Sequence, residues 1–264
     1  MPSLQKLVKV AAAFVASIGC LVLIGWILNI PILKSVLPGL ATMKANTALG
    51  FVLAGMSLFL LSKPTTCKRR LVGRLCCLGV AALSVATLSE YLFGWNLGID
   101  QFLAIDDPQP VNTSNPGRMS PLTAICFTLI SCALWLSGSK QRRASAGKLS
   151  WAEGFALFVS SIAAQVLIAY LYQVQPIIGL ITYTQMAVHT AVCFIVLGVG
   201  ILLAHPRQGL IDLITANSVG GVLARRLFPA AIAIPLVLGW LQTKSERMGL
   251  FNPEFGTSIL VVLN

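Results

Sequence analysis

Seven apolar runs, long enough to cross a lipid bilayer as helices, limit what this chain can fold into. A transmembrane helix needs about 20 largely apolar residues. The runs lie at residues 8–30, 44–62, 71–95, 120–138, 152–173, 185–204 and 227–242. Only 10% of the residues are charged, whereas a soluble domain carries about 25%. The sequence therefore predicts an all-α fold, a polytopic bundle of transmembrane helices.

An eighth apolar run begins near Phe255 and stops at Asn264. Ten helical residues cover about 15 Å of a hydrocarbon core that is about 30 Å thick. We therefore expect seven complete helices and a partial eighth, all within one integral membrane domain over residues 1–264. Two explanations stay open here: the chain is a fragment of a longer protein, or the last run is a half-helix packed against the others.

The basic residues are distributed unevenly among the segments that connect the runs. Most of the 19 lie on the side of Lys6 and Lys9, in the connections at 63–74, 140–148 and 207–226. Cytoplasmic connections of membrane proteins are enriched in Lys and Arg. We therefore expect a multi-pass protein of a bacterial inner (plasma) membrane with its N-terminus in the cytoplasm. Because the basic residues form short clusters and no single patch, they indicate a lipid bilayer as partner and argue against nucleic acid.

Three runs begin with one pattern, M-x-x-x-T-A-x-x-F-x-x-x followed by a small residue, starting at Met43, Met119 and Met186. Its Thr, Phe and small residue are four positions apart and share one helix face. These residues are Thr47, Phe51, Gly55, Thr123, Phe127, Ser131, Thr190, Phe194 and Gly198. We interpret the face as a helix-packing surface, because a small residue lets a neighbouring helix approach closely. A ligand-lining face is the alternative.

The three copies predict an internal repeat of three parallel helical hairpins, at residues 8–62, 71–138 and 152–204, followed by a divergent final pair at 227–264. The first runs of the second and third hairpins also match each other near their outer ends. Tyr91-Leu-Phe in one corresponds to Tyr170-Leu-Tyr in the other.

Polar side chains near the outer ends of the helices form the candidate ligand-binding site. An ionisable residue inside a membrane is costly and is a functional candidate for that reason. The residues are Glu90, Tyr91, Asp100, Tyr170, Tyr172 and His189. They would form a cluster open to the outside, where protonation of Glu90 or His189 reports pH or ligand occupancy. The alternative is that both residues lie at headgroup depth and are solvated there.

The sequence contains no pattern of catalytic residues, neither a Gly-rich phosphate loop nor H-E-x-x-H nor G-x-S-x-G. The seven cysteines have no spacing typical of a metal site. We expect no enzyme activity and no metal centre in this chain, and no residue pattern identifies a cofactor.

Several segments resemble a bacterial membrane sensor module. They are the repeated T-A-x-x-F helices, EYLFGWNLGIDQ at 90–101, PGRMSPLTA at 116–124, the stretch that begins with MAVHTA at 186–191 and ends with GGVLARRLFP at 220–229, residues 228–241, and EFG at 254–256. The module is the N-terminal multi-helix region of sensor histidine kinases, and sometimes of diguanylate cyclases, in cyanobacteria and proteobacteria. In that family the eighth helix leads into PAS or GAF domains and then a kinase, whereas this sequence stops at Asn264.

The resemblance implies a membrane-embedded signal-input module of a two-component system, whose longer parent protein is a histidine kinase, with a homodimer or a larger membrane assembly as partner. A non-catalytic accessory subunit of a membrane complex is the alternative. A small transporter is supported only by the parallel repeat, since midplane charges and broken helices are lacking.

Overall fold

A computed structural model describes residues 2–36, 40–62, 66–106, 115–138, 150–172 and 185–204, together with Val222 and Arg225. These residues form seven α-helices and no strand. The helices are α1 (Pro2–Ile27), α2 (Pro31–Lys34), α3 (Ala45–Leu61), α4 (Cys67–Phe93), α5 (Pro121–Ser137), α6 (Trp151–Tyr172) and α7 (Val188–Ala204). The predicted all-helical fold is confirmed for this part of the chain.

Three of these helices are long and apolar enough to cross a membrane, namely Leu4–Ile27, Cys67–Phe93 and Trp151–Leu171. The other long helices, α3, α5 and α7, are apolar but have 17 residues each, which corresponds to about 25 Å of helix. The predicted runs at 227–242 and 255–264 lie outside the described residues.

The helix ends differ from the predicted ones mainly where charged residues continue a helix. Helix α1 begins six residues before the predicted run and includes Lys6, and α4 begins four residues before its run and includes Lys68, Arg69 and Arg70. At its other end α4 stops at Gly94, whose φ of 67° is the left-handed conformation that glycine adopts readily after a helix.

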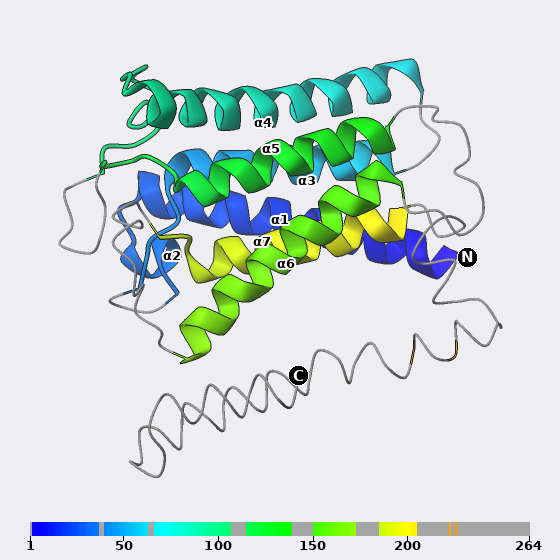
Figure 1. Cartoon of the computed structure of the whole chain (residues 1–264). Coiled ribbons are helices and arrows are strands. Elements are labelled where there is room, and N and C mark those ends of the chain that lie inside the picture. Colours follow the sequence, from blue (N-terminus) through cyan, green and yellow to red (C-terminus); the bar gives the residue numbers. More distant parts are fainter. Residues whose placement is uncertain are drawn as a thin grey trace, which may run out of the picture.

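The long helices form a closed arrangement in which α3, α5 and α7 meet at the centre (Figure 1). Each of the outer helices packs against two central ones: α1 against α3 and α7, α4 against α3 and α5, and α6 against α5 and α7. The loop end of the bundle is the end where α1, α4 and α6 finish. The N-terminal end is the end where they begin (Figure 1).

Three phenylalanine rings fill the centre of this arrangement. Phe51, Phe127 and Phe194 come from α3, α5 and α7, and each is at most 1% exposed. The ring centroids of the three pairs lie 4.8, 4.9 and 4.8 Å apart, at tilted or edge-to-face angles that favour aromatic contact. The side chains pack in direct contact along the central axis.

Small residues allow the central helices to approach their neighbours. A Cβ atom on Gly55 would lie 2.7 Å from the Ala12 carbonyl oxygen of α1. A Cβ atom on Gly198 would lie 2.1 Å from the Ser160 hydroxyl oxygen of α6. Ser131 holds the corresponding place in α5, where its carbonyl oxygen accepts a hydrogen bond from Cys77 of α4.

Candidate functional site

The three central helices are each preceded by a methionine whose carbonyl oxygen accepts a hydrogen bond from an aromatic side chain of an outer helix. The bonds are Trp26 Nε1 to Met43 (2.8 Å), Tyr91 Oη to Met119 (3.0 Å) and Tyr170 Oη to Met186 (2.9 Å). A buried carbonyl oxygen needs a hydrogen-bond partner. Each of these three lies one residue before the carbonyl that accepts the first hydrogen bond of its helix, so the helix itself provides no donor for it. The bonds therefore fix the start of each central helix against the end of an outer helix.

A basic side chain lies over the aromatic ring in two of these places. The Lys34 ammonium nitrogen is 4.3 Å from the centroid of the Trp26 ring, and the Arg118 guanidinium carbon is 5.2 Å from that of Tyr91. Both rings lie in the last turn of an outer helix or beside it, where the helix dipole also favours a cation. These contacts hold the connecting segments against the loop end of the bundle.

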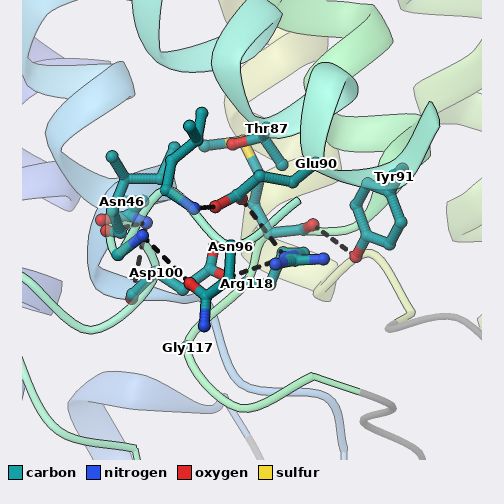
Figure 2. Close-up of polar contacts among 12 residues, drawn as sticks. Asn46, Thr87, Glu90, Tyr91, Asn96, Asp100, Gly117 and Arg118 are labelled. Atoms are coloured by element: carbon teal, nitrogen blue, oxygen red, sulfur yellow. Dashed lines mark hydrogen bonds and ion pairs between the residues drawn. The ribbon is translucent and has the colours of Figure 1, made fainter. Parts of the chain in front are cut away.

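Arg118 also joins two carboxylates in the interior of the loop end (Figure 2). Its Nε atom lies 2.7 Å from Asp100 Oδ2 and 3.3 Å from Glu90 Oε2. Glu90 comes from α4 and is 1% exposed, and its other carboxylate oxygen accepts a hydrogen bond from the Leu97 backbone N–H at 2.9 Å. Glu90 therefore binds the segment after α4 through both of its oxygens.

A second ion pair lies beside this cluster. The Lys44 ammonium group, just before α3, binds Asp106 at 2.5 Å, and the same Asp106 oxygen accepts a hydrogen bond from the Gly117 N–H at 2.8 Å. Asn46 of α3 donates to the Ile99 carbonyl oxygen at 2.9 Å. The segment that follows α4 is thus held by side chains at the starts of α3 and α5 as well.

Acidic groups outnumber basic groups among the described residues of this region. Three carboxyl groups face two basic side chains, and all five residues are between 1% and 8% exposed. Glu90 Oε2 lies in the ion pair with Arg118 but accepts no hydrogen bond from a described residue, and neither does Asp100 Oδ1. Because burying ions costs free energy that their attraction seldom recovers fully, this cluster contributes little net stability, and such a costly arrangement is typical of a functional site.

The structure brings together three of the six predicted ligand-site residues, namely Glu90, Tyr91 and Asp100. Tyr170 is at the loop end on α6, where it binds Met186. His189 is partly buried at the start of α7, and both of its ring nitrogens lack a hydrogen-bond partner in the described part of the chain. Tyr172 is the last residue of α6, and its side chain is not among those that the structure describes.

Sequence reasoning missed Arg118 in this cluster, and Lys44, Asp106 and Asn46 beside it. One signal could have found the two cations. Both are basic residues on the side where such residues are rare, and both are adjacent in sequence to a methionine that begins the repeated pattern. Comparisons with protein-family models, with curated proteins and with solved structures found no match to this chain.

Proposed function

We propose that the chain is a membrane-embedded signal-input module in which the segment between α4 and α5 receives the stimulus on the outer side of the membrane. The observation that carries this proposal is the buried cluster of Glu90, Arg118 and Asp100. Through it, and through Lys44 and Asn46, one polar segment is bound to α3, α4 and the start of α5. A stimulus that moves the segment would act on several helices at once.

The proposal includes three parallel hairpins, formed by α1 and α3, α4 and α5, and α6 and α7. The three aromatic-to-methionine hydrogen bonds support it, as do the three central phenylalanines. Corresponding residues of the outer helices are also buried alike: Val15, Val80 and Val159 lie 11 residues before Trp26, Tyr91 and Tyr170, and all are at most 1% exposed. In this alignment Glu90 corresponds to Gly25 and Ala169, so only the second hairpin carries the carboxylate.

The distribution of charge supports an orientation with the N-terminal end in the cytoplasm. Among the described residues, six basic side chains belong to the N-terminal turns of α1 and α4, with Glu153 as the acidic residue of that end. They are Lys6, Lys9, Lys68, Arg69, Arg70 and Arg74. In the same described part, three cations and three carboxylates lie at the loop end. A cytoplasmic side rich in Lys and Arg is typical of bacterial inner-membrane proteins.

Signalling by this arrangement requires two helix packings that are close in free energy and that the stimulus favours unequally. The excess carboxylate in the buried cluster is suited to this purpose, because adding a positive charge or separating the ions changes its energy strongly. Transport along the central axis is disfavoured, since Phe51, Phe127 and Phe194 pack there in direct contact.

The test is a fusion of the whole chain to a histidine-kinase output domain, with autophosphorylation as the measurement. Glu90→Gln and Arg118→Gln should each shift the phosphorylated fraction, because each weakens the hold of the helices on the outer segment. The matched control is Glu153→Gln, which alters a buried carboxylate at the other end. Gln can replace Glu153 in its hydrogen bonds with Ser150.

Unchanged phosphorylation in both loop-end variants would overturn the proposal. A non-catalytic accessory subunit predicts that outcome, and it further predicts that the chain co-purifies with other membrane proteins whose assembly fails without it.

A further inference from the structure

The outer face of α4 changes sharply from basic to apolar near the N-terminal end of the bundle. Lys68, Arg69 and Arg70 occupy its first turn, and the first two are exposed. Directly after them the helix exposes Leu71, Leu75 and Leu78, with 58%, 56% and 49% of their surfaces accessible. A short band of positive charge therefore lies directly beside an apolar stripe.

The basic residues of this band have no acidic partner in the part of the chain that the structure describes. No acidic residue lies in the first turn of α4, and none of the three forms an ion pair with another described residue. The helix dipole places further partial positive charge at the same point. Three cations at the positive end of a helix repel one another and the dipole, so an anion bound here would relieve that repulsion.

The apolar stripe indicates what kind of anion fits. Lys68 precedes Leu71, Leu75 and Leu78 by 3, 7 and 10 positions, which places all four residues on one side of an α-helix. A small inorganic anion would contact only the Lys68 ammonium group and leave the leucines uncovered. A molecule with a negatively charged head and an apolar tail would contact Lys68 with the head and the leucines with the tail.

The neighbouring helix provides an aromatic surface at the same depth. The Arg74 guanidinium carbon lies 5.0 Å from the centroid of the Trp135 ring of α5, and this tryptophan is 40% exposed. Partly exposed tryptophans concentrate at the boundary between lipid tails and head groups. This end of α4 therefore has the features of a helix that meets the head-group layer.

We propose that the basic turn of Lys68, Arg69 and Arg70, together with the stripe of Leu71, Leu75 and Leu78 that continues from Lys68, binds an anionic phospholipid of the surrounding leaflet. The phosphate group lies at the basic turn, and one acyl chain follows the leucine stripe. This inference rests on the membrane-spanning part of the proposed function and is independent of the sensory part.

The test is native mass spectrometry of the whole chain released from nanodiscs that contain phosphatidylglycerol and phosphatidylcholine with identical acyl chains in equal amounts. The chain should retain phosphatidylglycerol in preference, because a Lys or Arg near an anionic surface strengthens binding about fivefold at low salt. The triple variant Lys68→Gln/Arg69→Gln/Arg70→Gln should retain the two lipids equally. The matched variant Lys68→Arg/Arg69→Lys/Arg70→Lys keeps the charges and should keep the preference.

Three results would overturn the inference. They are equal retention of the two lipids by the unmodified chain, an unchanged preference in the triple Gln variant, and displacement of phosphatidylglycerol by inorganic phosphate more strongly than by sodium chloride of equal ionic strength. The last result would mean that the site binds the phosphate group alone. Circular dichroism checks that the triple variant is folded. If the triple variant does not fold, the single variant Lys68→Gln replaces it and should lower the preference for phosphatidylglycerol. A chain that fails to enter nanodiscs would contradict the proposed function itself.

Discussion

The Nε atom of Arg118 lies 3.3 Å from Oε2 of Glu90, although the two residues are 28 positions apart in the sequence and both are at least 93% buried. The contact joins the last turn of α4 to the segment that leads into α5. Since Asp100 binds the same nitrogen, the guanidinium group is the shared partner of two buried carboxylates.

Replacing Arg118 with Gln should therefore cost more stability than replacing Glu90 with Gln. Without the guanidinium group both carboxylates stay buried with no cation, and breaking a buried ion pair in this way costs about 3–5 kcal/mol. Gln at position 90 can still accept the Leu97 N–H, and Arg118 keeps Asp100, so that loss should be about 1–2 kcal/mol. The measurement is SDS-induced unfolding in detergent micelles, followed by circular dichroism. A smaller loss for the arginine variant would show that the guanidinium group is not the shared partner.

Much of this fold could be predicted because the long helices are apolar over most of their length. The six long helices coincide with predicted runs, and the two largest differences, at the starts of α1 and α4, lie at basic ends. Lys68, Arg69 and Arg70 continue α4 beyond its apolar run because long basic side chains can extend toward water from a helix end. Hydropathy detects the apolar part of a helix and misses such a turn.

The candidate site could be predicted only in part. Glu90 and Tyr91 stand out because charge and aromatic groups at a membrane helix end are conspicuous in a sequence. The pairing of Glu90 with Arg118 could not be found, because it depends on how the segment after α4 folds back, and no local spacing encodes a contact of that kind. The same holds for Lys44 and Asp106, which are 62 positions apart.

Gly55→Ala should destabilise the protein, and Gly154→Ala should not. The added Cβ atom at position 55 would lie 2.7 Å from a backbone oxygen of α1, which cannot move without shifting that helix, whereas nothing lies within 4 Å of a Cβ atom at position 154. Overpacking of this kind costs about 1–3 kcal/mol, and Ala in an open helix position is neutral or slightly favourable. The same SDS titration compares the two. Equal stabilities would mean that α1 and α3 are farther apart at Gly55 than the structure has them.

The three central phenylalanines should be equally important for stability. Each of Phe51, Phe127 and Phe194 is at most 1% exposed and contacts the other two rings, so Phe→Ala at any of them should cost about 3–5 kcal/mol. Phe158 of α6 is 58% exposed and provides the control, for which the loss should be small. A central variant that unfolds at the same SDS fraction as the Phe158 variant would contradict the central packing.

Tyr91 and Tyr170 should respond alike to loss of the hydroxyl group and differently to loss of the ring. Tyr→Phe removes one hydrogen bond to a methionine carbonyl oxygen at either position, at a cost of about 1–3 kcal/mol. Tyr→Leu also removes a ring that lies under Arg118 at position 91, which adds about 0.5–2 kcal/mol there. The measurement is the difference between the Leu and Phe variants at each position. An equal difference at both positions would show that the cation contributes nothing.

The orientation of the bundle can be tested with reporter fusions after Gln109 and after Lys140. Residues 96–118 lie on the predicted outer side, so alkaline phosphatase fused after Gln109 should be active in intact bacteria and a fluorescent protein there should be dark. Lys140 belongs to a basic connection on the predicted cytoplasmic side, where the two reporters should behave in the opposite way. An inactive phosphatase after Gln109 would put the cluster of Glu90, Arg118 and Asp100 on the cytoplasmic side, where an external stimulus could not reach it. The charge distribution would then contradict the positive-inside rule, and the sensory proposal would have to be given up even if the packing of the helices proved correct.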